Sequence, residues 1–221
     1  GMRGGLGHGI RPITISNANQ YVSTPADAAL ILNTPFSMLR TISKKSFVDP
    51  GYFSEKELNS IYSPVKIPVK TDFRRKNIVI LIVESFGREY IGAMNKDLDD
   101  GNYRGFTPNI DSLVERSLTF DYSFANGRKS IDGMPSILSS IPMFVEPFFL
   151  TSSSMNDVSG IAGELGKEGY HSAFFHGAPN GSMGFEAFAK ATGFKEYYGK
   201  DEYESDKRFG GKDDFDGSWA I

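Results

Sequence analysis

The sequence predicts an α/β fold with a largely parallel sheet flanked by helices. Three apolar or aromatic segments have the character of strands, at residues 78–83, 118–126 and 170–177. Helical patterns alternate with them, at residues 107–117, 130–141, 158–169 and 184–193. Alternation of strands and helices is typical of parallel sheets, because parallel neighbours are joined by helical crossovers.

The first 75 residues are expected to form an arm of short helices and turns that packs on the following domain. Glycines and turn-forming residues dominate its start, and Thr24 with Pro25 and Thr34 with Pro35 mark two helix starts. Proline is favoured in the first turn of a helix, directly after a capping residue. The arm has too few periodic apolar positions to bury a core by itself.

Residues 76–221 are expected to form the main domain. It opens on the uninterrupted apolar run Ile78–Val83, which is typical of a strand covered on both faces. Thr107 is expected to cap the next helix, with Pro108 as its first residue. In the helix predicted at 130–141, Pro135 is expected within the first turn, because a proline further inside would break the helix.

The composition excludes several classes of protein. A formal net charge of -3 and a pI of about 5.7 lack the basic footprint of a nucleic-acid-binding domain. The absence of cysteine excludes disulfide frameworks, thiolate zinc sites and cysteine nucleophiles. The longest apolar run has six residues, Ile78–Val83, whereas a helix that crosses a bilayer needs roughly 20. We therefore expect no membrane span within the chain.

Three polar residues follow the predicted strands: Glu84, Ser130 and His176. The carboxyl ends of parallel strands meet at one edge of a sheet, where ligands bind, so we expect the three residues near that edge. Each also has an ordinary structural interpretation. The glutamate can be a solvated loop residue, the serine an N-cap, and the histidine a packed or capping residue.

Four separated segments carry a family resemblance. They are RPITISNANQYVSTPADAALILNTPFS, NIVILIVESFGREYIG, TPNIDSLVERSLTFDYSFANGRKSIDGMPSILSSIP and FFHGAPNGSMGFEAFAKATGF. In this order they resemble the lipoteichoic acid synthase and phosphoglycerol transferase group, which belongs to the sulfatase-like branch of the alkaline phosphatase superfamily. The resemblance spans essentially the whole chain. It implies an alkaline-phosphatase-like fold that is truncated at its C-terminal side.

The resemblance also implies that Ser130 is the nucleophile, and that Glu84 and Ser130 bind a divalent metal, Mn²⁺ or Zn²⁺. A hard dication prefers oxygen ligands. It lowers the pKa of a coordinated hydroxyl, so that a serine can attack phosphorus. Arg128 and Lys129 are expected to add positive charge on the substrate side, with a solvated surface pair as the alternative.

His176 matches a family histidine near the polar head of the bound substrate, and Asn180 and Ser182 are expected as further substrate contacts. The sequence departs from the family close by. Met183 and Phe185 stand where lipoteichoic acid synthases carry a tryptophan and an arginine that hold glycerol phosphate. Phe185 lacks the paired donors of an arginine, so this departure weakens the case for glycerol phosphate and leaves phosphoryl transfer unaffected.

The family completes its metal site with an Asp-His pair, and the sequence contains no such dipeptide. Glu84 and Ser130 are too few for a dication, which needs about six oxygen ligands or four mixed ligands. The remaining ligands are therefore expected beyond Ile221. By itself the chain is expected to be inactive and metal-poor.

The function implied by the resemblance is metal-dependent transfer of a phosphoglycerol-type head group from a membrane lipid to a glycan or lipid acceptor, through a phosphoseryl intermediate. The expected location is the extracytoplasmic face of the bacterial inner membrane, with the full-length protein tethered to the membrane.

Several alternatives remain open. Phosphoethanolamine transfer and phosphodiester or sulfate-ester hydrolysis use the same fold. Sulfate-ester hydrolysis is disfavoured, because sulfatases carry a Cys/Ser-x-Pro-x-Arg motif and the run SIDGM from Ser130 has neither the Pro nor the Arg. A catalytically silent envelope binding module is the alternative from another functional class.

Overall fold

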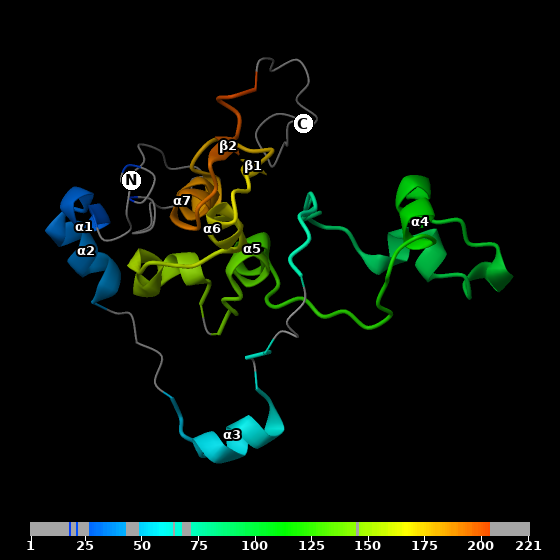
Figure 1. The fold of residues 1–221 in the computed structure, drawn as a ribbon, viewed down its shortest axis with the longest axis horizontal. Coiled ribbons are helices and arrows are strands. Elements are labelled where there is room, and N and C mark those ends of the chain that lie inside the picture. The colour runs from blue at the N-terminus through cyan, green and yellow to red at the C-terminus, as the bar shows by residue number, and fades with distance from the viewer. Residues whose placement is uncertain are drawn as a thin grey trace. The chain divides into compact units, whose positions relative to one another are not determined.

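The structure is a computed structural model that describes residues 18, 21, 27–42, 49–63, 65–67, 72–144 and 146–203. It divides into two compact units (Figure 1). Unit 1 combines Gly1–Ser46 with Ala125–Ile221, and unit 2 is Phe47–Phe124. The position of one unit relative to the other is not determined. The predicted domain boundary after residue 75 stays a prediction.

Unit 1 contains a two-stranded parallel sheet. In the sheet, β1 (Ala173–Phe175) pairs with β2 (Glu196–Tyr198). The crossover that parallel strands require consists of the 3-10 helix η8 (Ser182–Gly184) and the helix α7 (Phe185–Ala191). This β-α-β order confirms the predicted α/β class, and it confirms the strand within 170–177 and the helix within 184–193.

The predicted nucleophile, Ser130, begins the helix α5 (Ser130–Ser139), and α5 contacts the helix α6 (Ile161–Lys167) and the 3-10 helix η6 (Phe148–Leu150). The helices expected at 130–141 and 158–169 are thereby confirmed. A second 3-10 helix, η7 (Ser152–Met155), follows η6. Pro135 lies in the interior of α5, so its confinement to the first turn was wrong. Its missing N–H weakens the helix there.

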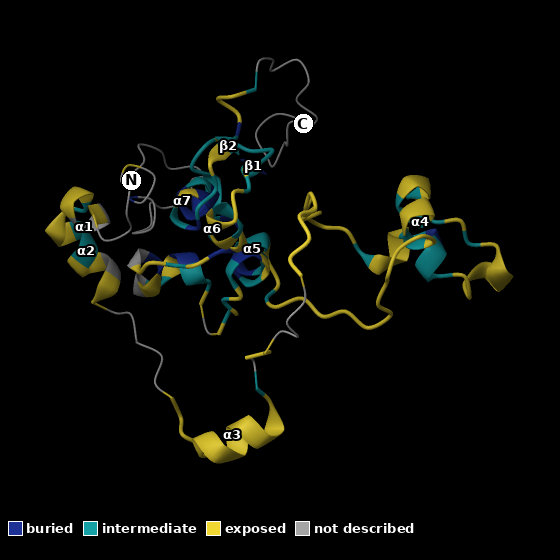
Figure 2. Cartoon of the chain, viewed as in Figure 1, coloured by how far each residue is buried: buried dark blue, intermediate teal, exposed yellow. Residues whose placement is uncertain are grey.

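The core of unit 1 is rich in aromatic side chains. Its buried members are Met134, Leu138, Phe149, Phe174, Phe185, Phe188 and Ala189. The rings of Phe149 and Phe188 meet edge to face at 5.1 Å between centroids, an arrangement that aromatic pairs favour. Figure 2 shows the buried residues in dark blue on α5 and α7. The core thus includes residues of α5, which begins with Ser130, and of β1, which His176 follows.

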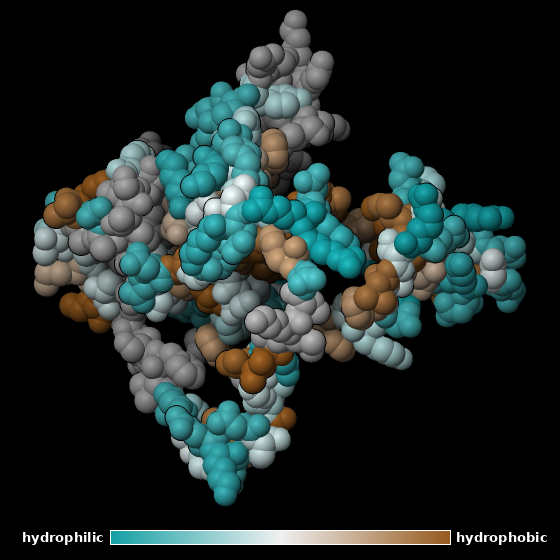
Figure 3. All heavy atoms as spheres, viewed as in Figure 1, coloured by the Kyte–Doolittle hydropathy of each residue, from teal (hydrophilic) through white to brown (hydrophobic). Residues whose placement is uncertain are grey.

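Two short helices of unit 1 precede this core, α1 (Ala28–Ile31) and α2 (Thr34–Thr41). The N-cap of α2 is Asn33, whose side-chain oxygen accepts from the Phe36 N–H at 3.3 Å. Thr34 is therefore the first helical residue and not the cap, because the asparagine amide takes the capping role. The helix start expected at Thr24 lies outside the described residues. Figure 3 shows apolar side chains at the surface beside these helices.

Unit 2 contains the helices α3 (Glu55–Ile61) and α4 (Pro108–Val114) and the 3-10 helices η3 (Arg88–Tyr90), η4 (Gly92–Met94) and η5 (Asp99–Gly101). A capping box between Ser54 and Glu57 begins α3, which satisfies donors that a helix start leaves free. The residues of α3 are exposed (Figure 2).

Hydrogen bonds hold the turns before α4 to one another, to the segment after α4 and to α4 itself. The guanidinium group of Arg88 donates to the carbonyl oxygens of Met94 at 3.0 Å and Asp121 at 2.7 Å. The N–H of Ala93 donates to Oδ1 of Asp111 at 3.1 Å. The helix predicted at 107–117 is confirmed over Pro108–Val114.

The strands predicted at 78–83 and 118–126 do not form in the described structure. The side chains from Ile78 to Val83 are between 39% and 79% exposed. An apolar strand needs neighbouring strands for its backbone groups and helices over both faces. The described part of unit 2 supplies neither, so these two strand predictions were wrong for this structure.

Across the part of the chain that is described, no helix combines the length and apolar character needed to cross a membrane.

Candidate active site

Ser130 is the first residue of α5 and is half-buried. The N-cap is Lys129, whose backbone is extended at φ -135° and ψ 154° and whose side chain makes no capping hydrogen bond. Ser130 therefore lies one residue inside the helix, and the N-cap interpretation of this serine is wrong. Its hydroxyl stands at a helix N-terminus, which favours anionic groups through its N–H groups and its dipole.

The loop before Ser130 is held in place by Asn126. The side-chain oxygen of Asn126 accepts from the Met143 N–H at 2.7 Å and from Oγ of Ser136 at 3.3 Å. These bonds join the loop to α5 and to the segment that follows it. The chain therefore enters α5 from a fixed point four residues before Ser130.

Arg128 and Lys129 are both exposed. Within the described residues, neither side chain makes a hydrogen bond or an ion pair. The two positive charges next to Ser130 in the chain are therefore not neutralised by described carboxylates.

The turn η8 brings Met183 to Ser130. The Oγ of Ser130 lies 3.9 Å from the Sδ of Met183, within reach of a weak hydrogen bond to sulfur. Met183 has a φ of 54° between the positive-φ residues Gly181 and Gly184. A side chain in this left-handed region is unfavourable, and such residues persist where the surrounding structure fixes them.

His176 directly follows β1 and is fixed by three contacts. Its backbone N–H donates to the Tyr198 oxygen at 2.9 Å. Its Nδ1 lies 2.9 Å from the Tyr197 hydroxyl, and its ring lies 4.9 Å from that of Phe185. The imidazole is therefore oriented by Tyr197 of the neighbouring strand and backed by a core phenylalanine.

Burial keeps both members of this pair uncharged. Burial lowers the pKa of His176 below its ordinary value, because the protonated ring loses water. Burial also raises the pKa of the Tyr197 hydroxyl, and the negative charges of Glu186 and Glu202 raise it further. A neutral imidazole and a neutral phenol thus share the hydrogen bond near pH 7.

Phe185 lies in the core and not at the surface. It is only 2% exposed, and its ring packs against those of His176 and Phe149. The side chain at this position therefore supports the imidazole from behind. Since Met183 precedes it by two residues, one short segment contacts both Ser130 and His176.

Asn180 has a structural role in the loop after β1. Its amide nitrogen donates to both carboxylate oxygens of Glu202, at 3.2 and 3.0 Å, and its oxygen accepts from the Asp201 N–H at 3.1 Å. Ser182 begins η8 and its N–H donates to the Pro179 oxygen at 3.0 Å. Substrate contacts by Asn180 and Ser182 stay predictions.

Glu84 lies in unit 2, in an exposed turn directly after the run Ile78–Val83. Ser130 lies in unit 1, so the predicted metal pair has one residue in each unit and stays a prediction. Within the described residues, no group of three or more His, Cys, Asp or Glu side chains is arranged to hold a metal ion. The described residues therefore do not fit a complete divalent-metal site.

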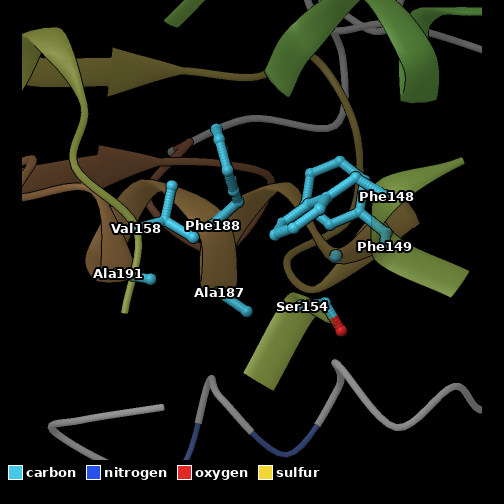
Figure 4. A pocket seen from close by; sticks show the side chains of 8 residues that line it. Phe148, Phe149, Ser154, Val158, Ala187, Phe188 and Ala191 are labelled. Atoms are coloured by element: carbon cyan, nitrogen blue, oxygen red, sulfur yellow. The ribbon is translucent and has the colours of Figure 1, made fainter. Parts of the chain in front are cut away.

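A small hollow beside the core is apolar (Figure 4). It is lined by Phe148, Phe149, Ser154, Val158, Gly184, Ala187, Phe188 and Ala191. The only hydroxyl among these, that of Ser154, donates to the Thr151 oxygen at 2.8 Å. None of the predicted site residues lines the hollow.

A family model described as Sulfatase matches residues 76–216. The chain belongs to the sulfatase family. Ser130, His176 and Glu84 all lie in the matched range. Membership in this family points to phosphoester or sulfate-ester chemistry on an enzyme-like fold. It does not distinguish the phosphoglycerol transferase group from other members.

A solved structure of a protein in the alkaline phosphatase superfamily from Vibrio parahaemolyticus also resembles the chain, with 23% sequence identity and a TM-score of 0.45. The match covers 60% of this chain and 30% of that protein. The chain thus spans less than a third of the length of the structure it matches.

Two residues of the candidate site were not singled out from the sequence. Tyr197 is brought to His176 by the parallel register of β1 and β2. Asp132 lies buried under the loop that precedes Ser130. The register of two strands separated by a crossover cannot be read from either segment alone. The place of Asp132 in the first turn of a helix is a local signal for a carboxylate, but it does not indicate burial.

Proposed function

We propose that the chain carries the nucleophile of a metal-dependent transferase that moves a phosphoglycerol-type head group from a membrane lipid to a glycan or lipid acceptor. The location proposed is the extracytoplasmic face of the bacterial inner membrane. The observation that carries the proposal is the placement of Ser130 as the first residue of α5, beside two cationic side chains. Sulfatase-family membership supports the same class of chemistry.

In the proposed first step, Oγ of Ser130 attacks the phosphorus of the lipid phosphodiester. An Oγ–P bond forms, the bond from phosphorus to the diacylglycerol oxygen breaks, and that oxygen takes up the proton lost by Ser130. In the second step, an acceptor hydroxyl attacks the same phosphorus, the Oγ–P bond breaks, and Oγ of Ser130 takes up the proton lost by the acceptor. A divalent cation held in part by Glu84 and Ser130 in the complete protein would supply Lewis-acid stabilisation of the phosphoryl oxygens.

In the proposed site, Arg128 and Lys129 supply positive charge next to the nucleophile. The N-terminus of α5 adds N–H groups and a positive dipole end, which stabilise phosphoryl oxygens. His176 is proposed on the substrate side, where its neutral ring exchanges hydrogen bonds and carries no charge. The chemistry of the described residues is thus suited to a monoanionic phosphodiester.

Phosphoethanolamine transfer is the second candidate, because one observation weakens the case for glycerol phosphate. Phe185 stands in the core at the position expected to carry the arginine that holds glycerol phosphate. No guanidinium group is present there to bind glycerol phosphate. Both candidates use the same nucleophile and differ only in the head group.

The test uses the full-length protein with vesicles that contain labelled phosphatidylglycerol or phosphatidylethanolamine. Release of diacylglycerol is measured with each lipid, and mass spectrometry identifies the phosphorylated residue in quenched reactions. We expect Ser130→Ala to lower the rate at least about 1,000-fold and to abolish the phosphorylated peptide. Turnover that persists in Ser130→Ala would contradict the proposal.

Ser139→Ala is the matched control, because Ser139 lies on the same helix and its buried hydroxyl has no hydrogen-bond partner among the described residues. We expect this variant to keep the wild-type rate. The ratio of the rates with the two lipids decides between the two head groups.

A further inference from the structure

We infer that Asp132 is a positioning residue that holds Ser130 in place through the preceding turn; this inference rests on the proposed role of Ser130 as nucleophile. Asp132 is 4% exposed. It lies two residues after Ser130, within the first turn of α5.

The carboxylate of Asp132 reaches back over the start of the helix. Its Oδ2 accepts from the backbone N–H of Arg128 at 3.3 Å. The backbone N–H of Asp132 donates to the oxygen of Lys129 at 2.9 Å. Asp132 therefore binds two backbone groups of the residues that lead into Ser130, the N–H of Arg128 and the carbonyl oxygen of Lys129.

This contact differs from an ordinary helix cap. In a capping box, the side chain of the third helical residue returns to the N–H of the N-cap residue. The side chain of Asp132 passes Lys129, which is the N-cap, and binds the residue before it. The bond therefore fixes the turn that delivers Ser130.

The turn is shaped to receive Asp132. Gly127 has a φ of 96°, and a Cβ added to it would lie 2.2 Å from Cβ of Asp132. Only glycine combines this backbone conformation with such a close approach. Gly127 and Asp132 therefore form one unit, and disturbing either is expected to move the same turn.

The second carboxylate oxygen of Asp132 is in an unfavourable environment. Oδ1 is buried and has no hydrogen-bond partner among the described residues. A buried acceptor without a partner is unfavourable. A carboxylate in the first turn is favoured by the helix dipole, but this preference does not require burial. The burial is explained by the contact with the turn.

The first test is kinetic and uses the full-length protein, with rates referred to the folded fraction measured by circular dichroism. We expect Asp132→Ala to lower kcat by about 10-fold to 100-fold, because small displacements of a reacting group have effects of this size. KM is expected to change less than about threefold, since substrate-binding groups remain. Asp132→Asn is expected to retain most of kcat, because its amide oxygen still accepts from Arg128. Gly127→Ala is expected to behave like Asp132→Ala.

Asp111→Ala is the matched control, because Asp111 also holds a backbone N–H, that of Ala93, from the start of a helix in unit 2. An equal loss of kcat in this control would overturn the inference, because any loop anchor would then suffice. Equal losses in Asp132→Asn and Asp132→Ala would also overturn it, since the charge and not the hydrogen bond would then matter. Normal kcat in Asp132→Ala with lowered thermal stability would show a purely structural role.

A second measurement does not depend on the proposed reaction. Amide hydrogen exchange at Arg128, Lys129 and Ser130 is compared between the wild type, Asp132→Ala and Asp111→Ala. We expect exchange at Arg128 to accelerate at least tenfold in Asp132→Ala alone, and unchanged exchange would overturn the inference. If Ser130→Ala keeps full activity while exchange at Arg128 responds as expected, the proposed function fails but the anchoring of Ser130 by Asp132 stands.

Discussion

The Oγ of Ser130 lies 3.9 Å from the Sδ of Met183, although 53 residues separate them in the chain. The contact depends on a turn in which Met183 adopts a left-handed backbone conformation, with φ at 54°. The proposed nucleophile is therefore in contact with the thioether of a residue whose backbone is strained.

Strain at Met183 predicts an unusual order of stability for two truncations. Met183→Ala and Met183→Gly remove the same packing against the core, but only glycine adopts a positive φ without penalty. We expect the glycine variant to be more stable than the alanine variant by about 1–2 kcal/mol, measured by urea unfolding. Equal stabilities, or a more stable alanine variant, would show that the backbone at residue 183 is not strained.

The pKa of His176 is expected below about 6.5, because burial disfavours the protonated ring. Between this lowered value and about 6.5, the unfolded state binds a proton that the folded state does not. The stabilising contribution of the neutral ring is therefore complete above this window and falls as the pH drops through it. NMR titration of His176 measures the pKa directly, and a value above 6.5 would contradict the burial argument.

Urea unfolding of the wild type and His176→Gln between pH 5 and 8 tests the same linkage. The difference in unfolding free energy between the two proteins is expected to favour the wild type more at pH 8 than at pH 5. A difference that does not depend on pH would mean that His176 titrates alike in both states.

The edge-to-face pair of Phe149 and Phe188 predicts a measurable coupling. Both rings are 3% exposed, and such pairs contribute about 0.5–1.5 kcal/mol beyond the area they bury. A double-mutant cycle with Phe149→Leu and Phe188→Leu is expected to show a coupling free energy of this size. Phe124→Leu serves as the control, since Phe124 is 92% exposed and its loss should change stability by less than about 0.5 kcal/mol.

The predicted metal pair can be tested through Glu84 in the full-length protein. Glu84→Gln removes a charged oxygen and is expected to lower the affinity for Mn²⁺ or Zn²⁺ at least tenfold, since even the partners of metal ligands contribute about 10–100-fold. Isothermal titration calorimetry measures the affinity. Glu115→Gln is the control, because Glu115 is also exposed in unit 2. An unchanged metal affinity in Glu84→Gln would show that Glu84 is not a metal ligand.

Patterns of neighbouring residues in the sequence correctly predicted several helices and one strand. The helix at Phe185–Ala191 and the strand at Ala173–Phe175 follow from short-range patterns. The predicted strand at 78–83 did not form, because strand formation depends on partners elsewhere in the protein. A run of apolar residues indicates that its side chains favour burial, but it does not show which strands and helices would cover them.

The candidate site was predictable in part. The pattern singled out Ser130, but not that Lys129 takes the N-cap position and leaves the serine inside the helix. The pairing of His176 with Tyr197 depends on the register of two strands joined by a crossover. Long-range geometry of this kind is absent from either segment alone.

The packing of Phe185 limits how the proposed head-group preference can be redesigned. Its ring fills the space between the His176 imidazole and Phe149. An arginine placed there to restore a phosphate contact would bring an unpaired cation into an apolar interior, at a large energetic penalty. New selectivity must therefore be introduced at exposed positions such as Arg128 and Lys129. A charged side chain placed there stays hydrated and does not have to enter the apolar core.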